Sequence, residues 1–127
     1  MKYAVVGSRK FTDYEYLKSV LDKFDDIDCI VSGACKGTDT LSEDYAKENN
    51  IPTIIHEADW KDFSEPCKIK YNQYGAYNCL SGLSRNTKIV NDCDILIAFI
   101  YGKSSGTKDS IKKAEKSGKE VIIMEVG

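Results

Sequence analysis

Short apolar segments alternate with amphipathic segments along the whole chain. The apolar segments have the length of strands, are rich in Val, Ile and aromatic residues, and are almost continuously apolar. This pattern is typical of strands that are buried on both faces of a parallel sheet. The expected strands are residues 2–6, 28–32, 53–56, 94–100 and 120–126.

Helices are predicted between these strands. Thr12 and Glu15 have the spacing of a capping box, and apolar residues then follow at helical intervals. A second helix is expected from about 38 to just before 51, and a further one from about 83 to 91. The last helix is expected to begin after Thr107 and to end at Gly118, a residue type that commonly terminates helices.

The alternation of strands and helices predicts an α/β fold. With right-handed crossovers it gives a single Rossmann-like three-layer sandwich around a five-stranded parallel sheet, in the strand order 3-2-1-4-5. The topological switch point then falls between the first and fourth strands, where ligands bind in such sheets.

Residues 61–84 interrupt this rhythm and form an extended connection. Their length suggests a lid over the ligand or an oligomer contact, and a surface excursion with no ligand role is the alternative. Tyr71, Tyr74 and Tyr77 recur every third residue, as a stripe on a helix would, and packing in a core or an interface is the simplest explanation.

Length and composition indicate one soluble globular domain over residues 1–127, with 42% hydrophobic and 30% charged residues. The 18 basic and 20 acidic residues give a net charge of −2, with a pI of 5.4. No Lys/Arg cluster stands out, so we expect nucleic acid not to be a partner. Only Arg9 and Arg85 among the basic residues are arginine.

The cysteines indicate the compartment. Their number is five, which is odd, and no Cys-x-x-Cys occurs. This usage predicts reduced thiols and a cytoplasmic protein. No segment is long and apolar enough for a membrane span, so no membrane partner is expected. We expect neither a metal nor a cofactor, because no spacing of ligands suits zinc.

Three loops rich in glycine and hydroxyl residues follow expected strands. They are residues 7–11, 32–39 and 102–107. The second and third lead directly into helices, whose first N–H groups and positive dipole end attract anions. Neither Gly-x-Gly-x-x-Gly nor Gly-x-x-x-x-Gly-Lys-Ser/Thr occurs. The loops therefore predict phosphate-sized anion sites outside the standard dinucleotide and P-loop classes.

Individual residues in and near these loops have two readings each. Arg9 and Arg85 suit a bidentate phosphate clamp, whereas the alternatives are a surface salt bridge and a structural helix start. Asp39 suits a ribose contact or a helix-capping role. Trp60 suits stacking on a base or partial burial in the core. Lys36 suits phosphate neutralisation or simple exposure to solvent.

The order and spacing of these motifs resemble a known family. The pattern resembles the YspA-like branch of the SLOG superfamily, which is related to the LOG phosphoribohydrolases and to the Rossmann-like domain of DNA-processing protein A. The matching residues are Gly7-Ser8-Arg9-x-Phe11, Ser32-Gly33-Ala34-x-x-Gly37-x-Asp39, Ala58-Asp59-Trp60, Arg85-Asn86, Ala98-Phe99 and Ser105-Gly106-Thr107. The resemblance implies a Rossmann-like fold, a nucleotide-derived ligand at the glycine-rich edge, and a homo-oligomer, either dimer or tetramer.

One departure from the family bears on activity. The position of the catalytic glutamate of LOG hydrolases is Ser110 here, and the adjacent Asp109 is turned about 100° around the helix. The sequence therefore leaves enzymatic activity undecided and favours a protein that is not an enzyme.

The expected function is binding of a phosphate-containing nucleotide derivative, as a sensor or a sequestering protein. The candidate ligands are a nucleoside phosphate, an ADP-ribose-like molecule and a cyclic nucleotide. The alternative is a LOG-like hydrolase that cleaves an N-glycosidic bond, with Asp39 or Asp59 as the candidate catalytic residue. The expected ligand-binding residues are Gly7, Ser8, Arg9, Gly33, Ala34, Lys36, Gly37, Asp39, Asp59, Trp60, Arg85, Asn86, Ser104, Ser105, Gly106 and Thr107.

Overall fold

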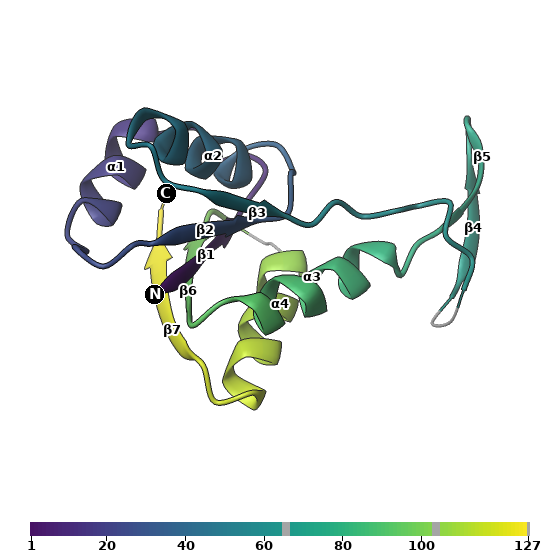
Figure 1. Cartoon of the computed structure of the whole chain (residues 1–127). Helices are drawn as coiled ribbons and strands as arrows, with labels where there is room; N and C mark the ends of the chain where they lie inside the picture. Colours follow the sequence, from purple (N-terminus) through teal and green to yellow (C-terminus); the bar gives the residue numbers. More distant parts are fainter. Residues whose placement is uncertain (65–66, 103–104, 127) are drawn as a thin grey trace.

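A computed structural model describes residues 1–64, 67–102 and 105–126 of the chain. Five parallel strands form one sheet in the order β3-β2-β1-β6-β7, which confirms the predicted fold class and strand order (Figure 1). The strands of this sheet are β1 (Lys2–Gly7), β2 (Cys29–Ser32), β3 (Thr53–Ile55), β6 (Ile95–Ile100) and β7 (Glu120–Glu125).

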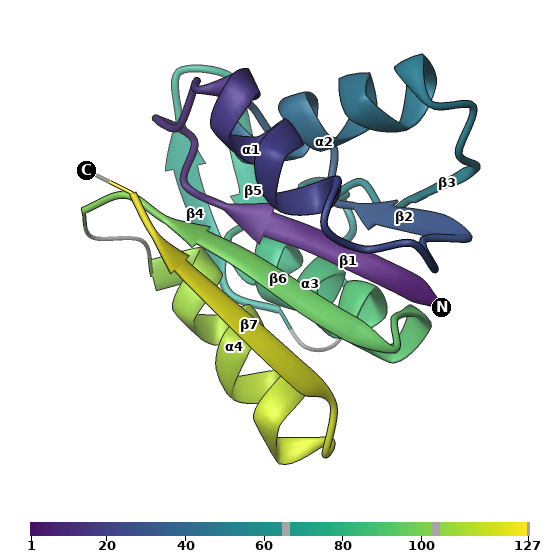
Figure 2. The ribbon, with the colours of Figure 1, turned by 90° about the vertical axis from the view of Figure 1, so that its left-hand side faces the viewer.

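Helices cover both faces of the sheet (Figure 2). The pairs α1/α2 and α3/α4 lie on opposite faces, as right-handed crossovers on either side of the switch point require. Each helix begins within three residues of its expected start, and the largest difference is at α4, which begins at Ser105 and not after Thr107. The helices are α1 (Tyr14–Leu21), α2 (Thr38–Glu48), α3 (Ser81–Asp92) and α4 (Ser105–Lys116).

The central strand β1 explains why the apolar runs are continuous. Tyr3 and Val5 belong to the core cluster under α1 and α2, whereas Ala4 and Val6 belong to the cluster under α3 and α4. Successive side chains of a strand point to opposite faces, so a strand between two helical layers needs an apolar residue at every position. Both clusters are therefore specified by the same short segment.

The start of α1 differs from the expected capping box. Asp13, not Thr12, is the N-cap, and its carboxylate accepts a hydrogen bond from the Tyr16 amide at 3.1 Å. An ionised acceptor three residues before that amide satisfies it more strongly than a hydroxyl does. The capping assignment to Thr12 was therefore wrong by one position.

The extended connection contains a two-stranded antiparallel ribbon of β4 (Ile69–Asn72) and β5 (Gly75–Asn78). It projects beyond the sandwich at the right of Figure 1. Tyr71 and Tyr74 are 79% and 80% exposed, so packing of the tyrosines as a helical stripe in a core was wrong. A spacing of three residues fits a helix, but here Gln73 and Tyr74 make the turn of a hairpin.

Candidate functional site

A cleft of about 490 Å³ lies at the carboxyl edge of the sheet, where the loops after β1 and β6 leave toward opposite faces. A second hollow of about 500 Å³ adjoins it and shares Arg9, Cys35, Trp60 and Arg85. This is the topological switch point of the sheet, the expected place for a ligand in an open α/β fold.

Most of the predicted ligand residues meet at this edge. Gly37 and Asp59 line neither hollow, and Ser104 lies outside the described residues. The predicted residues that line the cleft are Gly7, Ser8, Arg9, Asp39, Trp60, Arg85, Asn86, Ser105, Gly106 and Thr107. Those that line only the second hollow are Gly33, Ala34 and Lys36.

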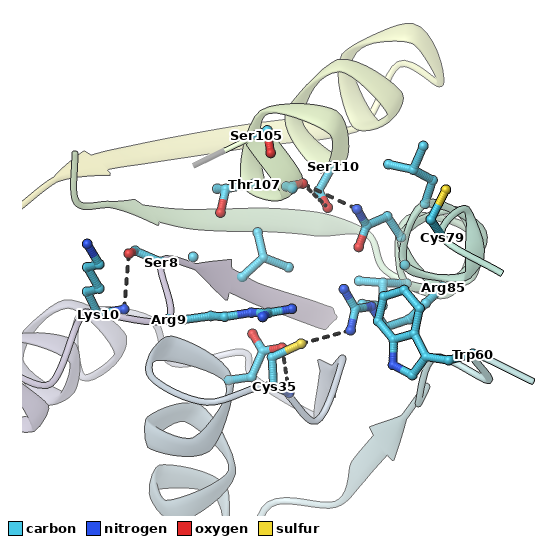
Figure 3. A pocket seen from close by; sticks show the side chains of 18 residues that line it. Ser8, Arg9, Lys10, Cys35, Trp60, Cys79, Arg85, Ser105, Thr107 and Ser110 are labelled. Atoms are coloured by element: carbon cyan, nitrogen blue, oxygen red, sulfur yellow. Dashed lines mark hydrogen bonds between the residues drawn. The ribbon is translucent and has the colours of Figure 1, made fainter. Parts of the chain in front are cut away.

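Two guanidinium groups approach each other in the cleft. Arg9 extends from the loop after β1 toward Arg85 on α3 (Figure 3). Arg85 Nη1 donates to the Gly33 carbonyl at 3.4 Å and to Cys35 Sγ at 2.8 Å, while its Nε is buried without a hydrogen-bond partner. Within the described part of the chain, neither arginine forms an ion pair within 4 Å. The cleft therefore presents concentrated positive charge.

Asp39 lines the same cleft and supplies a negative charge near these arginines, but its burial disfavours the ionised carboxylate. Its side chain, in the first turn of α2, is only 6% exposed and accepts a hydrogen bond from the Cys35 amide at 3.2 Å. Loss of hydration raises the pKa of Asp39 to about 6, while that amide and the Arg85 charge act in the opposite direction. Asp39 thus shapes the second loop and remains partly protonated in mildly acidic solution.

The start of α2 is already satisfied by protein groups. The Thr38 amide and hydroxyl both donate to the Ser8 carbonyl, at 3.2 and 3.0 Å. Gly37 has a φ of 75°, and a Cβ there would lie 2.5 Å from the carbonyl oxygens of Ser8 and Arg9. Two amides of the loop that was expected to bind an anion, those of Cys35 and Thr38, donate to protein oxygens. This loop positions Arg9.

The third loop is tied to α3 by Asn86. Its Nδ2 donates to the Gly106 carbonyl at 3.2 Å and to the Asp109 carboxylate at 3.1 Å. Lys113 pairs with Asp109 at 2.9 Å, whereas Ser110 lines the cleft. The position of the family glutamate therefore faces the cleft as a serine, and Asp109 is engaged elsewhere. Asn86 orients the start of α4.

Trp60 forms the wall between the cleft and the ribbon. It is 39% exposed, and its ring passes over Gly82, where a Cβ would lie 3.1 Å from the indole. The ring also contacts Tyr77 edge-on, at 6.3 Å between centroids. Asp59 is exposed, and its carboxylate accepts the Lys61 amide at 3.1 Å, so Asp59 organises the turn beside Trp60.

Several cleft residues were missed. Gly82, Asn86 and Ile89 share one face of α3 at intervals of three and four residues, so helical spacing from the motif at Arg85 would have found Gly82 and Ile89. No sequence signal brings Cys79 to the cleft. The lining residues absent from the prediction are Val6, Lys10, Cys35, Cys79, Gly82, Leu83, Ile89 and Ser110.

Two further observations concern metals and membranes. Among the residues that the structure describes, no group of three His, Cys, Asp or Glu side chains is arranged to hold a metal ion. No described helix has the length and apolar character of a membrane span. All five cysteines are free thiols.

The sequence of the first half of the chain decides its relationship. Residues 1–63 match the model of the YspA, cpYpsA-related SLOG family, YAcAr. The chain is therefore similar to this SLOG family over residues 1–63. The resemblance inferred from the loop motifs is confirmed. The chain is also 26% identical, over 99 residues, to the Gene 61 protein of Mycobacterium phage D29, covering 73% of this chain and 68% of the phage protein.

Two solved structures share the fold. DNA processing protein A from Streptococcus pneumoniae superposes with a TM-score of 0.74 at 24% identity, over 96% of this chain and 49% of its own. The protein of the same name from Helicobacter pylori gives 0.68 at 23% identity, over 97% of this chain and 64% of its own. The chain thus spans about half to two thirds of the length of these proteins.

The expectation that nucleic acid is not a partner is contradicted. The Helicobacter pylori structure describes a mode of single-stranded DNA binding, and its fold is the fold of this chain. The acidic pI misled because net charge averages the whole surface. A single strand needs only a local basic groove and aromatic side chains.

Proposed function

We propose that the cleft binds a nucleotide unit, with its phosphate between Arg9 and Arg85 and its base against Trp60. The observation that carries this proposal is the approach of two guanidiniums that form no ion pair within 4 Å among the described residues. Like charges in a cleft repel each other, and an anion between them removes that cost. Guanidinium groups match phosphate geometry bidentately.

The size and lining of the cleft support a nucleotide in particular. A volume of about 490 Å³ lies within the usual range of small-ligand sites. The exposed indole of Trp60 offers a stacking surface, and the exposed Ser105 at the start of α4 adds a hydroxyl. Phosphate and base groups therefore find complementary partners at one edge.

Phosphate and base groups occur both in free nucleotides and in single strands of nucleic acid. A nucleoside phosphate, an ADP-ribose-like molecule or a cyclic nucleotide would make this a sensor or sequestering protein. The fold shared with a single-stranded DNA-binding protein supports a single strand of nucleic acid as the ligand. The proposal is that one nucleotide unit occupies the cleft in either case.

Calorimetry with thymidine monophosphate, ADP-ribose, a cyclic nucleotide and an oligothymidylate of twelve nucleotides tests the proposal. We expect Arg9→Ala and Arg85→Ala each to weaken binding about 10- to 100-fold, the cost of a charged hydrogen-bonding pair. Lys47→Ala on α2, an exposed cation away from the cleft, is the control. Unchanged affinity in both arginine variants would refute the assignment.

A second candidate function is hydrolysis of the bound nucleotide. The observation that favours it is Asp39, a cleft carboxyl with a pKa raised to about 6, which suits a general acid or base. Long incubation of the ligand, followed by chromatography, tests it. Release of free base by the wild type but not by Asp39→Asn supports hydrolysis, whereas intact ligand supports binding alone.

A further inference from the structure

The β4–β5 ribbon has two chemically different faces. Lys70 pairs with Tyr77 across the ribbon, and Tyr71 pairs with Ala76. Because successive side chains alternate between faces, Lys70 and Tyr77 share one face while Tyr71 lies on the other. Ile69, 52% exposed, joins Tyr71 on that second face. One face is therefore basic and aromatic, and the other face is largely apolar.

The first face is continuous with the cleft. Tyr77 contacts Trp60, whose ring lines both hollows. The Lys61 ammonium group donates to the Ala76 carbonyl, and the Trp60 carbonyl accepts the Asn78 amide at 2.7 Å. Aromatic rings and ammonium groups thus lie one after another from the cleft to the ribbon. We name Trp60, Lys61, Lys70 and Tyr77 the ribbon face.

Charge in this part of the chain is distributed unevenly. The chain has 20 acidic residues, yet residues 67–91 contain none, while they contain Lys68, Lys70, Arg85 and Lys88. This segment includes the whole ribbon and most of α3. The net positive charge of this segment complements a polyanion, although the complete chain carries a net charge of −2.

We propose that the ribbon face binds single-stranded nucleic acid that continues from the nucleotide in the cleft. This inference rests on the proposed function of the cleft and extends it. Lys61 and Lys70 would contact backbone phosphates, and Trp60 and Tyr77 would stack with bases. Partly exposed aromatic side chains beside basic residues are the features that bind single strands independently of sequence. A second copy of the chain is the competing occupant of the projecting ribbon.

Fluorescence anisotropy with a labelled oligothymidylate of twelve nucleotides, beside calorimetry with thymidine monophosphate, tests this proposal. We expect the wild type to bind the oligonucleotide more tightly. Lys70→Glu and Tyr77→Ala should each weaken oligonucleotide binding about tenfold, and each should leave affinity for the monophosphate within about twofold. Lys70→Glu should also lower the slope of log affinity against log salt by about 0.7.

Two matched variants control for charge and for ring loss. Lys47→Glu makes the same charge change on α2, and Tyr71→Ala removes a ring from the opposite face. Losses equal to those of Lys70→Glu and Tyr77→Ala would overturn the ribbon proposal. So would oligonucleotide affinity no greater than that for the monophosphate, or self-association in sedimentation that Lys70→Glu abolishes without changing oligonucleotide binding.

The arginine variant separates this proposal from the proposed function. Arg85→Ala should weaken both ligands, since it acts in the cleft. If Arg85→Ala weakens both ligands while Lys70→Glu and Tyr77→Ala weaken neither, the cleft binds a nucleotide and the ribbon proposal fails. If Arg9→Ala and Arg85→Ala leave monophosphate affinity unchanged, the proposed function itself fails.

Discussion

Asp39 is the side chain through which pH acts on the cleft. Burial raises its pKa from 3.8 to about 6, so the folded protein binds this proton more tightly than the unfolded chain does. The free energy of unfolding therefore falls as pH rises between about 4 and 6, and this contribution is constant above about 6. Ionised Asp39 destabilises the fold at neutral pH and partly offsets the Arg85 charge.

Asp39→Asn should stabilise the protein at pH 7.5 by up to about 3 kcal/mol, because it removes a charge whose burial is unfavourable. The amide oxygen can still accept the Cys35 hydrogen bond. Urea unfolding at several pH values between 4 and 8 measures this effect. The gain should shrink toward pH 4, and a gain that is the same at every pH would contradict the burial argument.

For single residues in the loops, the sequence predicted which residue types suit a ligand but not whether each side chain lines the cleft. Arg9 and Arg85 were chosen because they are the two arginines and lie in motif positions, and both line the cleft. Asp59 lies between residues that line the second hollow, yet it lines neither hollow. Spacing cannot say which way a loop side chain points, because that direction depends on the hydrogen bonds of the surrounding backbone.

The loop from β2 to α2 packs closely against the loop after β1 and helps to position it. Gly37 allows the backbone to lie against the carbonyls of Ser8 and Arg9, and Thr38 hydrogen-bonds to the first of them. The placement of Arg9 in the cleft therefore depends on Gly37, a glycine 28 residues further along the chain. The sequence indicated an anion-binding loop, and the structure gives part of that loop a supporting role.

Gly37→Ala should lower the free energy of unfolding by more than about 2 kcal/mol, through an unfavourable positive φ and a clash with two carbonyls. It should also weaken nucleotide binding, because the loop that carries Arg9 must move. Gly118→Ala is the control, since Gly118 has the same φ of 75° but nothing within 4 Å. Equal losses of stability in urea unfolding would rule out the clash.

The elements themselves followed from hydrophobic periodicity. Strands with both faces buried and helices with one apolar face leave strong patterns, and their ends matched to within three residues. The ribbon left no such pattern, because β4 faces solvent along its whole length and only Asn78 of β5 is buried. A segment that buries little need not alternate apolar and polar residues, so the sequence could show only that residues 61–84 were different.

At the scale of the molecule, the sandwich and the ribbon should differ in stability. The central strands β1 and β6 contribute to both core clusters, whereas the ribbon is a two-stranded sheet with mostly exposed side chains. Isolated hairpins are marginal in water. The ribbon should therefore open far more often than the sheet.

Hydrogen exchange measures this difference. Amides of β1 and β6 should exchange only with global unfolding, and those of β4 and β5 should exchange much faster. A bound oligonucleotide should slow exchange in the ribbon, whereas thymidine monophosphate should not. Ribbon amides as protected as those of β1 in the free protein would contradict the assignment of low stability.

The sequence by itself determined the architecture of this protein: its five parallel strands, their order, the helical layers and the edge where the glycine loops meet. These follow from local periodicity and from the handedness of crossovers, which every segment carries independently. Only the tertiary structure decided which side chains face the cleft, that Arg9 approaches Arg85, and that Trp60 joins the cleft to a projecting ribbon. Those relations depend on contacts between residues far apart in the chain, which no local pattern records.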